Sequence, residues 1–193
     1  GLAPGSIYNL RGTGFRIGDS DNLLYEAGVV IGRNSVQISS AVRNELGQYD
    51  PSDFVPVEPL GEEWIGTDGG MHRSAAVDDR ESDVQIPITV RQETITFPEL
   101  DDNGLIIMRY YLCNTSLEPI TGLHSGMLVD YDLYGEEAAG FDIDQQMLFQ
   151  QSDSGPSAGL VGLKNIAAYH VHDNLPDAKV GFDNSTLFAE LSR

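Results

Sequence analysis

Apolar residues recur at every second position along much of this chain, and this period constrains the fold more than any other feature. The segments at 22–31 and 35–42 are rich in β-branched and apolar residues. In the second segment, Val36 and Ile38 fall on one face, with a polar residue between them. Successive side chains of a strand point to opposite faces, so the pattern predicts half-buried strands rather than helices.

The pattern continues through the middle of the chain. Alternation resumes at 84–97, where Ile88 and Ile95 have opposite parity, so we expect a β-bulge near Gln92. The segment at 105–114 is apolar on both faces, which is typical of a central strand covered on both sides. Further strands are expected at 123–133, at 146–151 and within 160–172, with loops at 135–140 and 152–159.

Two segments depart from this pattern. Residues 43–83 combine prolines, glycines and many acids, and predict a long polar excursion with one short strand around Trp64 and Ile65. Near the end of the chain, Asn184 or Ser185 could cap a helical turn. We therefore predict one domain over 1–193, an all-β, two-sheet antiparallel sandwich with long loops and a short C-terminal helical turn.

The charge of the chain excludes several classes of partner. It has 30 acidic and 11 basic side chains, a formal net charge of −19. Binding to nucleic acid needs clustered Lys and Arg, so we expect no nucleic-acid partner. No apolar run reaches the roughly 18 residues of a membrane span, so membrane insertion is not expected either. The acids fit an ordinary secreted protein or one adapted to salt.

Carboxylates and imidazoles give candidate metal ligands. Asp130 and Asp132 form one D-x-D pair, and Asp142 and Asp144 form another. Clustered carboxylates are what calcium requires, although neither pair has EF-hand spacing. The alternatives are solvated or turn-capping carboxylates, or an acid–base pair.

A third pair of candidate ligands lies near the end of the chain. His170 and His172 would share one face of a strand, with Asp173 or Glu190 as a third ligand. No cofactor is required by the sequence, and calcium is the one candidate.

Catalytic motifs are weaker. Residues 155–159 match the G-x-S-x-G pattern of a nucleophile elbow, but Leu160 to Leu163 predict a strand where the elbow needs a helix. We interpret the motif as a hairpin turn and name no catalytic residue. The single cysteine, Cys113, lies in an apolar segment and is expected to be a buried, inert thiol.

Aromatic side chains in loops are candidate ligand-binding residues. Trp64 lies in the long excursion, and Tyr131 and Tyr134 flank the acidic pairs. Such rings can stack on sugars, or they can fix a loop to the core.

The segment 105–133 resembles a known β-sandwich region. The similarity lies in Ile107-x-x-Tyr110, Asn114-Thr115-Ser116, Pro119-Ile120, Gly126-Met127 and Asp130-Tyr131-Asp132. Together these residues resemble an accessory region of large secreted bacterial multidomain proteins, some with subtilisin-like peptidase domains. The resemblance implies an extracellular or cell-envelope location and other domains of the same polypeptide as partners. It carries over no catalytic residue.

These observations lead to three candidate functions. The first is a non-catalytic structural or interaction module of an exported bacterial protein, with loops 43–83 and 134–145 as contact surfaces for a protein or a glycan. The second is a carbohydrate-binding module, with or without a structural calcium ion. The third is a hydrolase. In each case the chain is interpreted as one piece of a larger protein.

The net charge gives a first prediction about stability. Salt should weaken the repulsion between carboxylates in the folded chain, because the Debye length falls from about 30 Å at 0.01 M to about 3 Å at 1 M. Thermal unfolding should therefore occur at a higher temperature in high NaCl. A melting temperature that does not rise across this range would show that self-repulsion does not limit stability.

Overall fold

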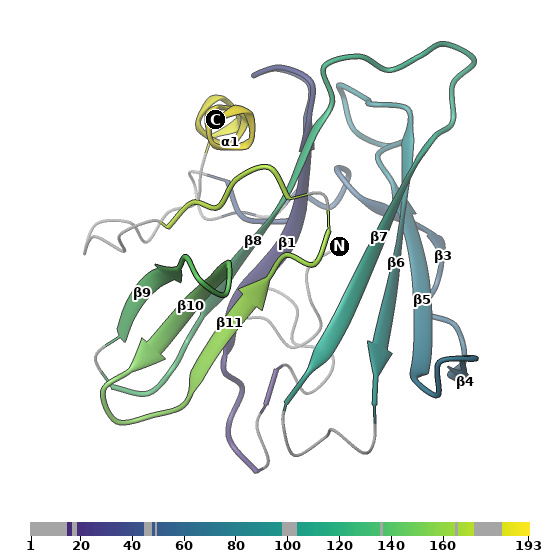
Figure 1. The fold of residues 1–193 in the computed structure, drawn as a ribbon. Helices are drawn as coiled ribbons and strands as arrows, with labels where there is room; N and C mark the ends of the chain where they lie inside the picture. The colour runs from purple at the N-terminus through teal and green to yellow at the C-terminus, as the bar shows by residue number, and fades with distance from the viewer. Residues whose placement is uncertain are drawn as a thin grey trace.

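The computed structural model describes residues 15–16, 19–44, 48, 50–97, 104–135, 137–164, 166–171 and 183–193. These residues form an all-β fold of antiparallel sheets with one short helix near the end of the chain (Figure 1), as the sequence predicts. The strands are β1 (Leu24–Gly32), β2 (Ile38–Ser40), β3 (Val55–Glu58), β4 (Trp64–Ile65), β5 (Met71–Asp78), β6 (Ile88–Thr96), β7 (Ile106–Asn114), β8 (His124–Tyr131), β9 (Glu137–Asp142), β10 (Met147–Ser152) and β11 (Ser157–Val161), and the helix is α1 (Asn184–Ser192).

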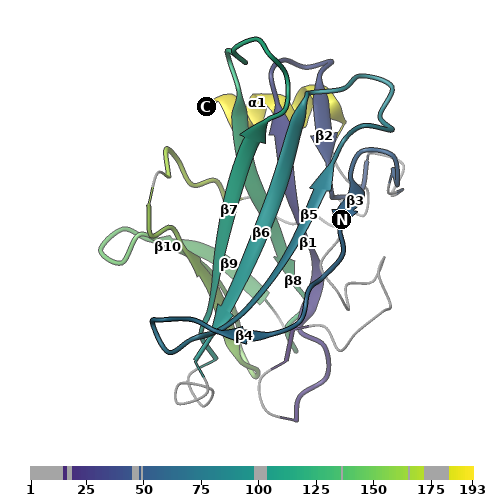
Figure 2. The same ribbon diagram turned by 90° about the vertical axis from the view of Figure 1, so that its right-hand side faces the viewer.

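The strands pair into three sheets. The first has the order β2-β1-β8, and the second has the order β3-β5-β6-β7 with β4 also paired to β5. These two sheets face each other as a sandwich (Figures 1 and 2). The third sheet, β11-β10-β9, lies beside the β1–β8 sheet and adds to the two sheets expected.

Strand β1 is buried on both faces. Ile31 faces the five-stranded sheet and packs in the same cluster as Val90 of β6. Val30, one residue earlier, faces the other way and packs with Leu187 of α1. A third cluster joins the start of β1 to the third sheet and consists of Leu23, Leu133 and Ala158 with Phe15 and Tyr131. The β1–β8 sheet is therefore the middle layer between the large sheet and the helix.

The helix packs closely because its partner strand offers a glycine. A Cβ at Gly126 of β8 would lie 2.6 Å from Leu191 Cδ2 of α1, so any side chain there would force Leu191 to move. The cap is Asp183, whose carboxylate accepts the backbone N–H of Thr186 at 2.7 Å. The expected caps, Asn184 and Ser185, are wrong, since both lie inside the helix.

A buried carboxylate links the two facing sheets. Asp79, which follows β5, accepts a hydrogen bond from Ser39 Oγ of β2 at 2.9 Å and another from the backbone N–H of Ile86. Its side chain is buried, and this burial raises the pKa of Asp79. These hydrogen bonds satisfy a polar group that would otherwise be costly to bury.

The segment 43–83 is more regular than predicted. The short strand at Trp64–Ile65 is confirmed as β4, but β3 and β5 also lie in this segment. Strand β5 was missed because its sequence, MHRSAAVD, consists mostly of polar and small residues and lacks an alternating row of large apolar ones. Pairing with β6 along its whole length stabilises it instead.

No β-bulge occurs near Gln92. The register of β6 is continuous with both β5 and β7. Ile88 and Val90 face the sandwich core, whereas Ile95 is fully buried on the opposite, outer face. The turn after β4 covers Ile95 there, since a Cβ at Gly70 would lie 2.6 Å from Ile95 Cγ2. Both parities are therefore buried without any shift in register.

The prediction of a central strand at 105–114 is wrong. Strand β7 ends the order of the five-stranded sheet, and no described strand pairs with its second edge. Cys113 is exposed rather than buried. Residues 137–142, expected as a loop, form β9, and Ser157 begins β11 in a hairpin with β10. The hairpin interpretation of residues 155–159 is thus confirmed.

Within the described residues, α1 is far too short to cross a bilayer, and no helix qualifies as a membrane span.

The double burial of β1 predicts a large effect of truncating its core side chain. Ile31→Ala removes a side chain that is 1% exposed, and should lower the free energy of unfolding by about 2–5 kcal/mol. Val36→Ala is the matched control, since Val36 is 65% exposed and should cost at most about 0.5 kcal/mol. Denaturant unfolding measures both variants, and equal losses would contradict the assigned core.

Candidate functional site

The candidate site lies on the outer face of the five-stranded sheet. Strand β4 and the turn after it cross the lower end of this sheet in Figure 2. Trp64 pairs directly with His72 of β5, so both side chains point to the same face. The turn at 66–70 closes with a hydrogen bond from Gly66 N to Gly70 O at 2.9 Å. Gly66 is required here because a side chain would collide with His72 and Asp68.

His72 is held by a carboxylate on each ring nitrogen. Nε2 lies 2.8 Å from Asp68 Oδ1, and Nδ1 lies 2.9 Å from Glu93 Oε1. A neutral imidazole has one N–H only, whereas the imidazolium donates from both nitrogens. The geometry therefore fits a charged His72 between two carboxylates, although the residue is only 5% exposed.

The pKa values of the three groups shift together. Hydrogen bonds to Asp68 and then Glu93 raise the pKa of His72, against the opposing effect of its burial. The hydrogen bond from His72 lowers the pKa of Asp68, and another lowers the pKa of Glu93. The three groups thus favour one another's charged forms.

Glu93 extends this cluster across the sheet. Its second oxygen, Oε2, lies 3.3 Å from Arg109 Nη1 and accepts a hydrogen bond from Tyr111 Oη at 3.2 Å. We call the five residues Asp68, His72, Glu93, Arg109 and Tyr111 the His72 network. It joins the turn after β4 to β5, β6 and β7.

Trp64 rests on this network. Its ring stacks on the His72 ring, with 5.4 Å between centroids and 27° between planes. The side chain nevertheless remains 43% exposed. One indole surface is therefore fixed against a buried ring, and the residue still presents apolar area to solvent. We call the outer sheet surface formed by Trp64 and the His72 network the Trp64 face.

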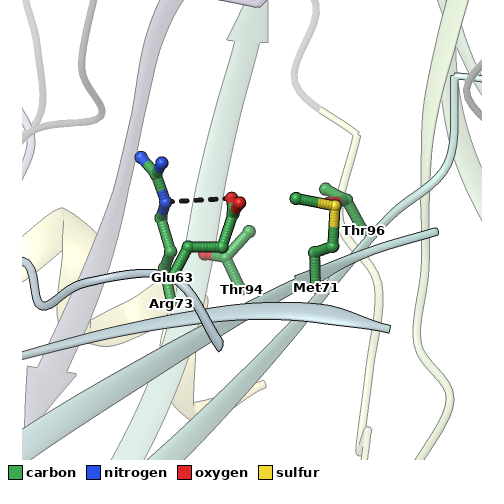
Figure 3. A pocket seen from close by; sticks show the side chains of 5 residues that line it. All are labelled: Glu63, Met71, Arg73, Thr94 and Thr96. Carbon is green, nitrogen blue, oxygen red and sulfur yellow. Dashed lines mark ion pairs between the residues drawn. The ribbon is translucent and has the colours of Figure 1, made fainter. Parts of the chain in front are cut away.

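A pocket of about 310 Å³ lies on the other side of β5. Figure 3 shows its lining, in which Arg73 Nε and Glu63 Oε2 form an ion pair at 3.2 Å. Arg73 follows His72 directly, so the two side chains point to opposite faces of the sheet. The remaining lining residues are Met71, Thr94 and Thr96. This pocket offers hydroxyls and one exposed ion pair, and its lining contains no pair of carboxylates.

A second pocket, of about 350 Å³, lies between the end of β2 and the start of α1. Its carboxylates already have structural partners. Asp53 accepts the backbone N–H of Ser40, Asp50 accepts that of Ser52, and Asp183 caps α1. These hydrogen bonds explain the carboxylates without a bound ion.

One member of the first acidic pair, Asp130, joins an ion-pair cluster with Arg43 and Glu26. Asp130 Oδ2 lies 3.8 Å from Arg43 Nη2, and Arg43 Nη1 lies 2.9 Å from Glu26 Oε2. Glu26 is 1% exposed, and its burial raises its pKa. Asp132 is exposed and follows β8. Asp130 therefore balances a charge in the fold.

The second acidic pair shapes the hairpin between β9 and β10. Asp142 accepts the backbone N–H groups of Asp144 and Gln145 at 2.9 and 3.0 Å, and Asp144 is exposed. Among the described residues, no three His, Cys, Asp or Glu side chains form a group that could hold a metal ion. The calcium site thus remains a prediction from sequence.

The histidine pair is only partly visible. His170 lies outside any strand, and its Nδ1 is 3.7 Å from Glu190 Oε2. This neighbour is one of the two third ligands expected, although the described residues 166–171 form no strand. His172 and Asp173 lie outside the described residues.

The two candidate tyrosines have structural contacts. Tyr131 packs on Phe15 with ring centroids 5.7 Å apart, and burial raises its pKa. Tyr134 is 44% exposed, and its Oη accepts the backbone N–H of Asp21 at 3.0 Å. Neither tyrosine lies on the sheet that carries Trp64, so the three expected aromatic residues do not form one row.

Sequence reasoning missed all five residues of the His72 network. They come from four separate segments, and only the strand register brings them together. A usable signal was the glycine-rich turn at 66–70 before His72, which predicts a hairpin that places Trp64 beside it.

The His72 network predicts a distinct pH dependence of stability. A raised histidine pKa contributes stability below the unfolded value of about 6.5, and this contribution is lost as pH rises through the folded pKa. The lowered pKa values of Asp68 and Glu93 contribute stability that is lost on acidification. The unfolding free energy of the native chain minus that of His72→Gln should therefore be largest at mildly acidic pH.

The matched control for this prediction is His124→Gln. Its ring contacts that of Phe188 edge-on, and among the described residues it forms no ion pair with a carboxylate. Denaturant unfolding at a series of pH values measures all three proteins. A difference for His72→Gln that does not change with pH would mean that the ring is not charged in the folded state.

Comparison with known proteins gives no relationship for this chain. No protein-family model matches it, and searches of curated proteins and of solved structures found no match.

Proposed function

We propose that this chain is a non-catalytic interaction module whose contact surface is the Trp64 face. The observation that carries the proposal is the contrast between two stacked rings. The imidazole beneath is 5% exposed and held at both nitrogens, while the indole above it keeps 43% of its surface exposed. Rigid, partly exposed aromatic side chains are the residues that most often anchor binding interfaces.

The placement of the other titratable groups supports a non-catalytic role. Catalysis needs an acid, a base or a nucleophile to converge on a cavity. Buried carboxylates such as Glu26, Asp53 and Asp79 instead hold backbone N–H groups, hydroxyls or an arginine. Their raised pKa values follow from burial at positions that join strands and loops. No specific observation favours a hydrolase.

The same proposal includes an exported bacterial protein with further domains in the same polypeptide. Its support is the resemblance of residues 105–133 and the acidic surface. Of the two expected contact loops, 43–83 and 134–145, the Trp64 face favours the first, because Trp64 lies in it and is stacked on His72. In the second loop, the Tyr134 hydroxyl is already engaged by the backbone N–H of Asp21.

A carbohydrate-binding module is the second candidate, and the chemistry around Trp64 favours it. Sugars present C–H faces that stack on an indole and hydroxyls that pair with carboxylates and guanidinium groups. Asp68 has a 39% exposed side chain beside Trp64, and Arg109 is 50% exposed on the same face. The ligand in this case is a polysaccharide or glycan, and calcium is not needed for it.

This candidate predicts that a saccharide changes the fluorescence of Trp64. Trp64 is the single tryptophan of the chain, so its emission reports on this site alone. Glycan-array screening of the 193-residue chain would identify saccharides to titrate. Trp64→Ala should then abolish detectable array binding, because stacked aromatic anchors contribute about 2 kcal/mol or more to binding.

Tyr134→Ala is the matched control, since Tyr134 is exposed to the same extent as Trp64. It should bind like the native chain. Circular dichroism checks that both variants fold. Binding that survives Trp64→Ala, or that is lost equally in Tyr134→Ala, would refute the Trp64 face as the contact surface, and a blank array with folded protein would refute the carbohydrate ligand.

A further inference from the structure

Strand β7 has an unprotected edge. It is nine residues long, its register with β6 is continuous, and no described strand pairs with its other side. Unpaired backbone groups along such an edge can accept another strand. Its sequence contains no proline, lysine or acid, which are the residues that commonly prevent this pairing.

Each of the other sheet edges is shorter than β7, and most of them also carry such protection. Strand β3 contains Pro56 and Glu58 with a shift in register between them. Strands β2 and β4 have only three and two residues. Strand β8 contains Asp130 and contacts α1, and β9 contains Glu137 and Asp142. Strand β11 lacks such residues but has only five residues. Among the sheet edges that the structure describes, β7 is the longest, and it has none of these features.

The side chains of β7 are apolar on both faces. Ile106 is 43% exposed, Tyr111 46% and Leu112 37%, so apolar area remains uncovered on each face. This is the feature that made the sequence typical of a central strand, covered on both sides. A further strand that continues the sheet beyond β7 would cover these exposed apolar side chains. It would also give β7 the central position that its apolar sequence predicts.

The charge of the chain indicates which strand this is. The net charge is −19, yet no acid occurs from Leu105 to Leu117. The single charge on β7, Arg109, is already paired with Glu93. Two copies of the chain repel each other over most of their surfaces, and β7 is where they can approach with least repulsion.

The β7 sequence is also complementary to itself. An antiparallel pair with a two-fold axis at Tyr110 is the register in which all nine residues of one copy meet all nine of the other. Arg109 then lies opposite Tyr111, Met108 opposite Leu112 and Ile107 opposite Cys113 of the second copy. Every pair except the one ending at Asn114 joins apolar, aromatic or aromatic–cation partners.

We propose that a second copy of this chain pairs with β7 in this register, which joins two five-stranded sheets into one continuous sheet. This interface does not use Trp64, and the dimer leaves Trp64 on the outer face. Arg109 and Tyr111 of the His72 network lie on β7 beside the new strand.

Sedimentation equilibrium of the 193-residue chain tests the dimer. The dimer fraction should rise with concentration, and it should rise further in about 1 M NaCl, where charge repulsion is screened. Leu112→Lys should raise the dissociation constant about tenfold or more, because the charge enters the interface twice. Ile65→Lys is the matched control, since Ile65 is 78% exposed on β4, and it should leave the dissociation constant unchanged.

A cysteine variant tests the register. Within one chain, positions 107 and 113 are about 20 Å apart along the strand, too far for a disulfide. In the proposed dimer, Ile107→Cys would face Cys113 of the second copy at disulfide distance. Copper phenanthroline should therefore oxidise Ile107→Cys to a covalent dimer, and Ile106→Cys should crosslink much less.

Three outcomes would overturn the proposal. The first is a native chain that stays monomeric up to its solubility limit in high salt. The second is a Leu112→Lys variant that remains folded and dimerises as tightly as the native chain. The third is equal crosslinking of the Ile107→Cys and Ile106→Cys variants. Melting temperatures of all variants identify any loss that is caused by unfolding.

Discussion

The burial of β1 on both faces is the constraint on which the rest of the structure depends. Val30 and Ile31 are neighbours in sequence, yet one contacts the helix cluster and the other the core between the sheets. The strand can satisfy both only if a sheet covers one face and a helix covers the other. Pairing with β8 along nearly its whole length then fixes the middle layer. The five-stranded sheet is held against this layer by the core around Ile31 and by the Asp79 hydrogen bonds, so its outer face is left to solvent and its far strand, β7, is left as an edge.

The outer face is organised differently from the core. It has few large apolar side chains, and the large side chain that is fully buried there, Ile95, depends on the turn after β4 for its cover. That turn is fixed by Asp68, which accepts the backbone N–H of Gly70 at 3.0 Å as well as pairing with His72. The Asp68–His72 ion pair therefore holds the turn that covers Ile95, and it also fixes the imidazole on which the indole of Trp64 stacks. This surface presents one aromatic ring above a network of charged, hydrogen-bonded side chains. It suits binding better than catalysis, because the charged groups are already paired with one another.

Much of the fold could be predicted from sequence, and the failures have physical causes. The strands at β1, β8 and β10 follow regular alternation or apolar runs between turns, and they were found. Strand β5 was missed because it is stabilised by backbone pairing rather than by a row of large apolar residues. Strand β7 was placed in the centre because its apolar faces do not reveal which edge lacks a partner. The bulge near Gln92 was wrong because β6 buries apolar residues on both of its faces. A change in the position of the apolar residues from even to odd numbers therefore did not require a shift in register. The candidate site was beyond reach for a related reason: Trp64 was identified, but His72, Glu93 and Arg109 meet only through the register of three strands.

The protonation state of His72 tests most directly how the exposed indole is held. Nitrogen-15 NMR of the labelled chain distinguishes an imidazolium, with both ring nitrogens protonated, from either neutral tautomer. Carboxylates at 2.8 and 2.9 Å from the two nitrogens predict that both are protonated near neutral pH in the folded protein. Asp68→Asn should then lower the pH at which the second proton is lost. A neutral ring with one unprotonated nitrogen near neutral pH would contradict the charged His72 beneath Trp64. It would also contradict the ion pairs that are proposed to hold the Trp64 face.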